Sequence, residues 1–157
     1  METPVRKTVM IVEDQDAVRG IVHKWLSEMF PLIDIIPTKT AEEALARVWC
    51  HSVKVDIVIM DIGLPGMQGI DAVRQIKQIS PATQAVMLTC KKGDEYYAQS
   101  MAAGAAFYVV KEKAGIDLRK VMKKLLGQEV QNKPGPLSEV AAAGPDPAVQ
   151  TALGVLS

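Results

Sequence analysis

The 157-residue sequence predicts an α/β domain with a doubly wound, five-stranded parallel sheet and helices on both faces. Three observations support this fold class. Short apolar runs alternate strictly with amphipathic helical segments, which favours a parallel sheet with right-handed crossovers. One run, 55–60, is nearly continuous in apolar residues, as a strand buried on both faces requires. Only two phenylalanines occur, so the core is built from Val, Ile, Leu, Met and Ala, the usual residues of a parallel sheet.

The first half of the chain contains two predicted strand and helix pairs. Residues 8–12 form a strand that stops at a run of acidic and amide residues, 13–16. The helix that follows ends at Phe30-Pro31, and its apolar stripe is Val18, Ile21, Val22, Trp25, Leu26 and Met29. Residues 32–36 form the second strand. Thr40-Ala-Glu-Glu43 matches a capping box, and the helix after it buries Ala41, Ala44, Leu45 and Val48.

The second half supplies three further strands. The strand 55–60 ends at Asp61, and the glycine-rich loop 63–69 leads into a helix that ends near Ser80-Pro81. Residues 85–88 form the fourth strand, followed by a weak helix around 95–103. The fifth strand is 107–110, and the last helix, about 117–126, buries Leu118, Val121, Met122 and Leu125. Trp25 and Trp49 are both expected at core or helix-packing positions.

Composition limits the domain organisation and the class of protein. Four of the nine prolines lie in the last 28 residues, which predicts a folded domain over 1–129 and a linker or flexible tail over 130–157. Lys plus Arg and Asp plus Glu both number 18, so no broad attraction to nucleic acid is expected. No apolar run is long enough to span a membrane, and the N-terminus has no secretory signal pattern, so we expect a soluble cytoplasmic protein. The two cysteines do not form a CxxC pair, which makes a disulfide framework or structural zinc improbable.

Polar side chains follow four of the five predicted strands at their carboxyl ends. They are Glu13 and Asp14 after the first strand, Asp61 after the third, Thr89 after the fourth and Lys111 after the fifth. In the flavodoxin-like strand order 2-1-3-4-5 the first and third strands are neighbours, so three carboxylates converge in one crevice. Their mutual repulsion favours a bound cation, and an all-oxygen ligand set favours Mg²⁺. Taken singly, each residue has an ordinary alternative: a helix cap for Asp14 or Asp16, a solvated hydroxyl for Thr89, a surface position for Lys111.

Four segments resemble the receiver domain of bacterial two-component response regulators. They are Val9-Met-Ile-Val-Glu-Asp14, Met60-Asp-Ile-Gly-Leu-Pro-Gly-Met-Gln-Gly69, Met87-Leu-Thr89 and Gly104-Ala-Ala-Phe-Tyr-Val-Val-Lys111, in family order and spacing over about residues 5–127. The resemblance implies that Asp61 accepts a phosphoryl group from a phosphohistidine on a sensor kinase or phosphotransfer protein. It also implies that Glu13, Asp14, Asp61 and the backbone carbonyl of Gly63 hold Mg²⁺.

The same resemblance implies a switch rather than a turnover enzyme. Lys111 and Thr89 are expected to contact the phosphoryl oxygens, and the aromatic side chain of Tyr108 to rotate inward when Thr89 moves. Phosphorylation then changes a protein-binding surface formed by the fourth helix, the fifth strand and the last helix. Two neighbours depart from the common family pattern: Cys90 follows Thr89, and Glu112 follows Lys111. Cys90 is expected to behave as a small buried hydrophobe.

Other classes of protein share some of these sequence features. An aspartyl-phosphate phosphatase of the haloacid dehalogenase type shares the Asp, Thr and Lys, but Gly63 stands where its general acid belongs. The basic last helix is interpreted as a solvated face or a protein-docking surface, because no nucleic-acid recognition motif or aromatic platform accompanies it. We expect a stand-alone receiver that acts through protein contacts, with a homodimer as a further hypothesis. The alternative is the receiver segment of a longer DNA-binding transcriptional regulator.

Overall fold

The computed structural model describes residues 5–127, which form a single parallel sheet with the strand order β2-β1-β3-β4-β5. The strands are β1 (Lys7–Val12), β2 (Ile33–Thr38), β3 (Ile57–Met60), β4 (Gln84–Thr89) and β5 (Phe107–Val110). The helices are α1 (Asp16–Met29), α2 (Ala41–Trp49), α3 (Gly69–Ile79), α4 (Asp94–Ala103) and α5 (Ala114–Leu126), with a 3₁₀ turn η1 (Lys111–Lys113) before the last. The predicted flavodoxin-like fold and strand order are confirmed.

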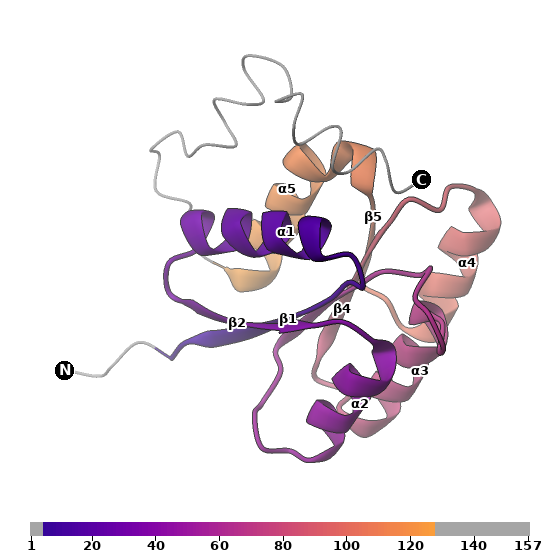
Figure 1. Ribbon diagram of the computed structural model, residues 1–157, viewed down its shortest axis with the longest axis horizontal. Helices are drawn as coiled ribbons and strands as arrows, with labels where there is room; N and C mark the ends of the chain where they lie inside the picture. The colour runs from indigo at the N-terminus through magenta and orange to yellow at the C-terminus, as the bar shows by residue number, and fades with distance from the viewer. Residues whose placement is uncertain (1–4, 128–157) are drawn as a thin grey trace.

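The sheet separates two hydrophobic cores. Helices α1 and α5 cover one face, and α2, α3 and α4 cover the other (Figure 1). Along β1 the side chains alternate between the two cores: Val9 and Ile11 face α1 and α5, whereas Met10 and Val12 face α2 and α3. This alternation explains why the central strands are apolar at every position.

Three element boundaries differ most from the predicted ones. Strand β3 begins at Ile57 rather than Val55, because Asp56 bonds with the start of β1: its N–H donates to the Thr8 carbonyl, and its Oδ2 accepts from the Thr8 N–H at 2.9 Å. Strand β2 continues through a proline, which an edge strand tolerates. Helix α5 begins at Ala114, three residues earlier than predicted, as a continuation of the 3₁₀ turn η1.

The capping box before α2 forms in a modified way. Thr40 Oγ1 accepts a hydrogen bond from the Glu43 N–H at 3.1 Å, as predicted. The return bond goes one residue further upstream, because Glu43 Oε2 accepts from the N–H of Lys39 at 3.2 Å. The first bond satisfies a backbone donor that the first turn of the helix leaves unpaired, and the second ties the helix to the residue before its N-cap.

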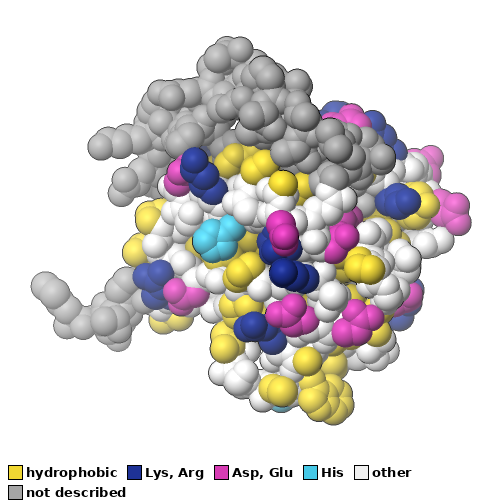
Figure 2. Space-filling view, viewed as in Figure 1, with side chains coloured by type: hydrophobic (Ala, Val, Ile, Leu, Met, Phe, Trp, Pro, Cys, Tyr) yellow, Lys and Arg dark blue, Asp and Glu magenta, His cyan; other side chains and the backbone are white. Residues whose placement is uncertain are grey.

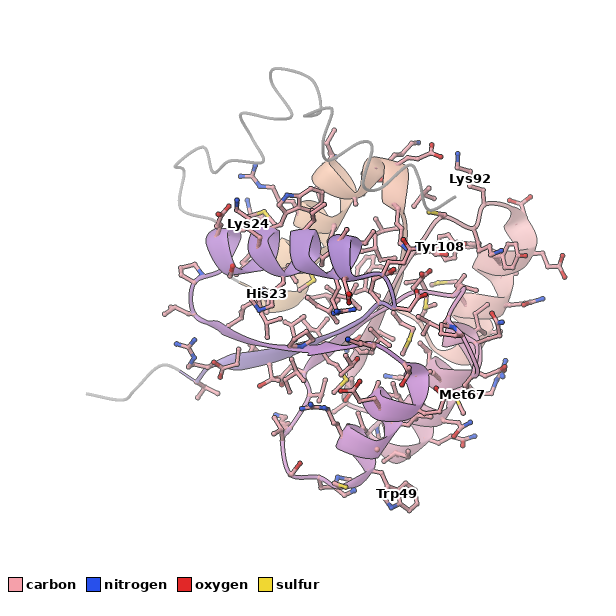
Figure 3. The ribbon with its side chains drawn as sticks, viewed as in Figure 1. His23, Lys24, Trp49, Met67, Lys92 and Tyr108 are labelled. Atoms are coloured by element: carbon pink, nitrogen blue, oxygen red, sulfur yellow. The ribbon has the colours of Figure 1, made fainter. Side chains whose placement is uncertain are left out.

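The predicted core or helix-packing position is wrong for one of the two tryptophans. Trp25 of α1 is buried, with 7% of its surface exposed, but Trp49 is 69% exposed. Helix α2 buries Ala41, Ala44 and Val48, so the next position, its last residue, turns away from the sheet. Figure 3 shows the Trp49 side chain pointing outward at the end of α2, and Figure 2 shows hydrophobic side chains at the surface of the same end.

None of the helices within residues 5–127 is long and apolar enough to cross a membrane. The predicted tail, 130–157, lies outside the described residues.

Candidate functional site

The acidic residues of the site are brought together by main-chain bonds that extend the sheet beyond its regular strands. The Glu13 N–H donates to the Thr38 carbonyl of β2, at 3.1 Å, and the Asp61 N–H donates to the Val12 carbonyl of β1, at 3.2 Å. Because β1 lies between β2 and β3, these bonds hold the residues that follow β1 and β3 side by side. The crevice predicted at the carboxyl ends of these strands is therefore present.

Lys111 joins the two most deeply placed carboxylates. Its Nζ donates to Asp61 Oδ2 at 3.0 Å and lies 2.9 Å from Glu13 Oε2. All three residues are buried, with 2% of Lys111, 3% of Glu13 and 7% of Asp61 exposed. A lysine that ends an apolar strand thus lies in the site rather than at the surface, where a lone lysine is usually found.

The third carboxylate, Asp14, completes a cluster open to solvent on one side. One oxygen each of Glu13, Asp14 and Asp61 lies within 4.8 Å of the others, and Asp14 is only half-buried. The helix-cap alternative for Asp14 and Asp16 is not seen, because Gln15 is the N-cap residue of α1 and makes no side-chain cap bond. Asp16 pairs instead with Arg19.

Burial and like charge perturb the titration of this cluster. Burial, and then repulsion by Asp61, raises the pKa of Glu13 from its ordinary 4.5 to about 7, even though Lys111 acts in the opposite direction. Burial disfavours the charged form of Lys111, but the Asp61 and Glu13 carboxylates outweigh this and hold its pKa above the ordinary value. The lysine is therefore a permanent positive charge in the site near neutral pH.

The residues present fit a hard divalent cation. Three carboxylates and one ammonium group leave two negative charges when all are ionised, which matches the charge of Mg²⁺. The donors are all oxygen atoms, the type that Mg²⁺ prefers, and the half-buried Asp14 leaves room for the water ligands that this ion retains. Burial and, second, repulsion by Asp61 raise the pKa of Glu13, and a bound cation would oppose both effects by favouring the ionised carboxylate.

Thr89 and Tyr108 are linked through the loop that follows β4. Thr89 is fully buried, and its Oγ1 accepts a hydrogen bond from the Lys91 N–H at 3.1 Å. The Tyr108 hydroxyl donates to the carbonyl of the same Lys91 at 2.6 Å, and its ring meets that of Tyr97 edge to face, with 5.8 Å between centroids. Figure 3 shows Tyr108 on the side of the sheet that faces α4. Thr89 and Tyr108 are therefore hydrogen-bonded to the backbone of the same residue, Lys91.

The same loop is tied to the segment after β5. Lys92, three residues after Thr89, forms an exposed ion pair at 2.6 Å with Glu112, which directly follows Lys111. Glu112 is one of the two departures from the family pattern noted above. Cys90, the other, is only half-buried rather than buried as expected, and partial burial raises the pKa of its thiol.

The loop after β3 packs tightly against Asp61. The N–H groups of Leu64 and Gly69 both donate to the Ile62 carbonyl at 3.0 Å. A Cβ atom on Gly69 would lie 1.8 Å from the backbone oxygen of Asp61, so only glycine fits there. Gly63, the predicted source of a carbonyl ligand, is exposed at the start of this loop.

Two residues that support the site were not predicted from the sequence. Arg19 of α1 donates to the Glu13 carbonyl at 2.8 Å, which fixes the backbone between the two acids of the first loop. Glu42 of α2 accepts a hydrogen bond from the Met67 N–H at 2.8 Å, although 25 residues separate them. The amphipathic pattern places both side chains on polar helix faces and carries no information about these partners.

The geometry agrees with comparisons to known proteins. The family model described as the response regulator receiver domain matches residues 9–123. The two-component response regulator PhoP of Pseudomonas aeruginosa is 34% identical over 103 residues, which is 66% of this chain and 44% of that protein. The chain thus spans less than half the length of this curated relative.

Solved structures extend the likeness to the fold. A CheY-like receiver domain protein from Methanospirillum hungatei superimposes with a TM-score of 0.69 at 26% identity, covering 78% of this chain and 96% of that one. The response regulator TrrA from Thermotoga maritima, solved in complex with Mg²⁺-BeF, gives 0.66 at 29% identity, covering 76% and 98%. The chain belongs to the response regulator receiver domain family of two-component systems.

Proposed function

We propose that this domain is a phosphorylation-activated switch in which Asp61 accepts a phosphoryl group in the presence of Mg²⁺. One observation carries the proposal. A buried ammonium group, Lys111, contacts Asp61 at 3.0 Å while two further carboxylates lie within 4.8 Å. Such a site combines a nucleophile, a fixed positive charge and a metal-binding cluster, the parts that phosphoryl transfer needs.

The transfer makes one bond and breaks one bond. A carboxylate oxygen of Asp61 attacks the phosphorus of a phosphohistidine, the P–N bond breaks, and the imidazole nitrogen keeps the electron pair. Lys111 is placed to stabilise the negative charge on the phosphoryl oxygens, and Thr89 Oγ1 to donate to one of them. Glu13, Asp14, Asp61 and the Gly63 carbonyl would hold Mg²⁺, which when bound neutralises phosphoryl charge and orients the group.

The product is an acyl phosphate that changes a surface rather than a substrate. Thr89 gives up its bond with the Lys91 N–H when it turns toward the phosphoryl group, and this loosens the loop that Tyr108 also holds. The affected surface consists of α4, β5 and α5, where Tyr97, Met101 and Ile116 are exposed. Exposed apolar side chains of this kind favour a protein partner.

The partners follow from this chemistry. The phosphoryl donor is a sensor histidine kinase or a histidine phosphotransfer protein, and the receiver of the signal is a downstream protein or a covalently attached effector. Because PhoP is more than twice as long as the matched segment, a DNA-binding regulator remains the alternative setting for this domain. A homodimer through the α4, β5 and α5 face is tested by chromatography with and without a phosphoryl mimic. A cytoplasmic location stays a prediction.

Incubation with acetyl phosphate and Mg²⁺, followed by intact-mass measurement, tests the phosphoacceptor assignment. The wild type is expected to gain one phosphate, and Asp61→Asn none. Asp71→Asn is the matched control, because Asp71 is an exposed partner of Arg74 on α3 and is expected to leave the gain unchanged. A wild type that never gains phosphate, or an Asp61→Asn variant that still does, contradicts the proposal. Sustained release of phosphate from unrelated phosphate esters favours the phosphatase alternative instead.

A further inference from the structure

The loop between β3 and α3 is held firmly at its end, at Gly69, less firmly at its start, and through a longer contact at its tip. Gly69 closes it against Ile62 and Asp61, as described above. At its start, the bond from the Leu64 N–H to the Ile62 carbonyl makes a three-residue turn centred on Gly63. A turn with one bent hydrogen bond sets the direction of the Gly63 peptide weakly, so this direction depends on how the rest of the loop is held.

The tip of the loop is held by helix α2. Glu42 Oε1 accepts from the Met67 N–H at 2.8 Å, and this bond lowers the pKa of Glu42, so the carboxylate is charged near neutral pH. A charged acceptor on a backbone donor gives a stronger hydrogen bond than a neutral one. The Met67 side chain is also held, because Gln75 Nε2 of α3 lies 3.7 Å from its sulfur.

The chain at Gly66 is shaped to receive this carboxylate. Its φ is +75°, and a Cβ atom built there would lie 2.6 Å from Glu42 Oε1. Glycine therefore serves two purposes, since it adopts the left-handed conformation and lets the carboxylate approach the loop.

The neighbouring acid of α2 does something different. Glu43 Oε2 accepts from the Lys39 N–H, and its Oε1 pairs with Arg47 of the same helix at 3.5 Å. Both acids lie in the first turn of α2, where they interact equally with the helix dipole. They differ in that Glu42 reaches the loop after β3, whereas the contacts described for Glu43 are with its own helix and the residue before its N-cap.

We propose that Glu42 is a positioning residue for the metal site: by holding the Met67 amide it fixes the loop that carries Gly63, and thereby raises the affinity of the acidic cluster for Mg²⁺. This inference rests on the proposed function. Glu42 supplies no ligand itself, and its effect reaches the cation through the backbone of the loop. Groups that orient metal ligands in this way commonly change metal affinity by tenfold or more.

Mg²⁺ titration of metal-free protein by isothermal calorimetry tests the inference. Glu42→Ala is expected to weaken Mg²⁺ binding about tenfold, the lower end of the range for such groups. Glu42→Gln is expected to fall between this variant and the wild type, because an amide oxygen still accepts from the Met67 N–H. Glu43→Ala and Glu43→Gln remove the same negative charge from the same helix turn and are expected to stay within about twofold of the wild type.

A thermal melt of each metal-free variant separates positioning from loss of structure. The Glu42 and Glu43 variants are expected to melt alike without metal and to differ only in the stabilisation that added Mg²⁺ gives. Gly66→Ala supplies a second perturbation of the same contact. Its effect on Mg²⁺ affinity is expected to be smaller in the Glu42→Ala background than in the wild type, because the clash with the carboxylate is gone.

The outcomes distinguish this inference from the proposed function. Equal weakening of Mg²⁺ binding by the Glu42 and Glu43 variants assigns the effect to charge alone and overturns the positioning role. Wild-type affinity in Glu42→Ala overturns it as well, while phosphorylation of Asp61 in the wild type leaves the proposed function standing. A wild type that neither binds Mg²⁺ nor takes up phosphate overturns both.

Discussion

The Glu13→Gln variant tests the electrostatics of the site through the stability of the metal-free protein. Glu13 is 3% exposed, and its pKa is about 7 in the folded protein against an ordinary 4.5. Between these two values the folded protein binds a proton that the unfolded chain has released. The free energy of unfolding therefore falls as the pH rises from about 4.5 through about 7. Over this range the Glu13 carboxyl loses its proton more readily in the unfolded chain than in the folded protein, so rising pH stabilises the unfolded state more.

The size of the effect follows from the two pKa values. At about 1.4 kcal/mol for each pH unit, the full loss amounts to about 3 kcal/mol, most of it between about pH 5 and pH 8. Other perturbed groups titrate outside this window. The pKa values of Asp16 and Glu42 are lowered, so they titrate below it, and that of Lys111 is raised, so it titrates above it.

Urea unfolding of both proteins across this pH range, with a chelator present, measures the difference. Relative to Glu13→Gln, the wild type is expected to lose about 2 to 3 kcal/mol between about pH 5 and pH 8. Saturating Mg²⁺ is expected to remove the loss, because the cation favours the ionised carboxylate. A difference that stays flat across the range, or one in which the wild type gains stability with pH, refutes the assignment of a buried carboxyl repelled by Asp61.

Three further variants probe the surroundings of the site, and Gly20→Ala serves as a control for one of them. Lys111→Gln leaves two buried carboxylates uncompensated, so metal-free protein near pH 8 is expected to lose about 3 kcal/mol of stability in urea unfolding, and less at lower pH where Glu13 is protonated. Gly69→Ala forces the Asp61 backbone to move and is expected to cost about 2 kcal/mol, whereas Gly20→Ala, with open space around it on α1, is expected to stabilise by up to about 1 kcal/mol. Tyr108→Phe removes the hydroxyl bond to the loop after β4, so amide hydrogen exchange in that loop is expected to quicken while global stability changes by about 1 kcal/mol or less.

The sequence predicted the architecture because the signals that determine it are local and repeated. Alternating strand and helix patterns are read within windows of a few residues, and the crossover rule then leaves few ways to arrange them. The acids and the lysine of the site were predicted for a related reason. Parallel strands bring their carboxyl ends to one edge, so residues such as Asp61 and Lys111 meet there whatever the details of packing.

The sequence did not predict how surface side chains are placed or which backbone groups far along the chain they contact. Trp49 has the large apolar side chain that is expected in a core. Its exposure depends on where helix α2 ends relative to the sheet. The bond from Glu42 to Met67 joins residues 25 positions apart, and no periodicity indicates which of two adjacent acids makes it. The loop conformation at Gly66 decides that choice.

By itself, the sequence determined the strand order, the set of carboxylates, threonine and lysine at one sheet edge, and the family to which they point. Only the tertiary structure decided how these groups are charged and how firmly they are held. The raised pKa of Glu13 comes from burial next to Asp61. The loop after β3 is held by Glu42 of helix α2, which lies 25 residues before Met67 in the chain. Such properties depend on desolvation and on distances between groups far apart in the chain, which local patterns do not encode.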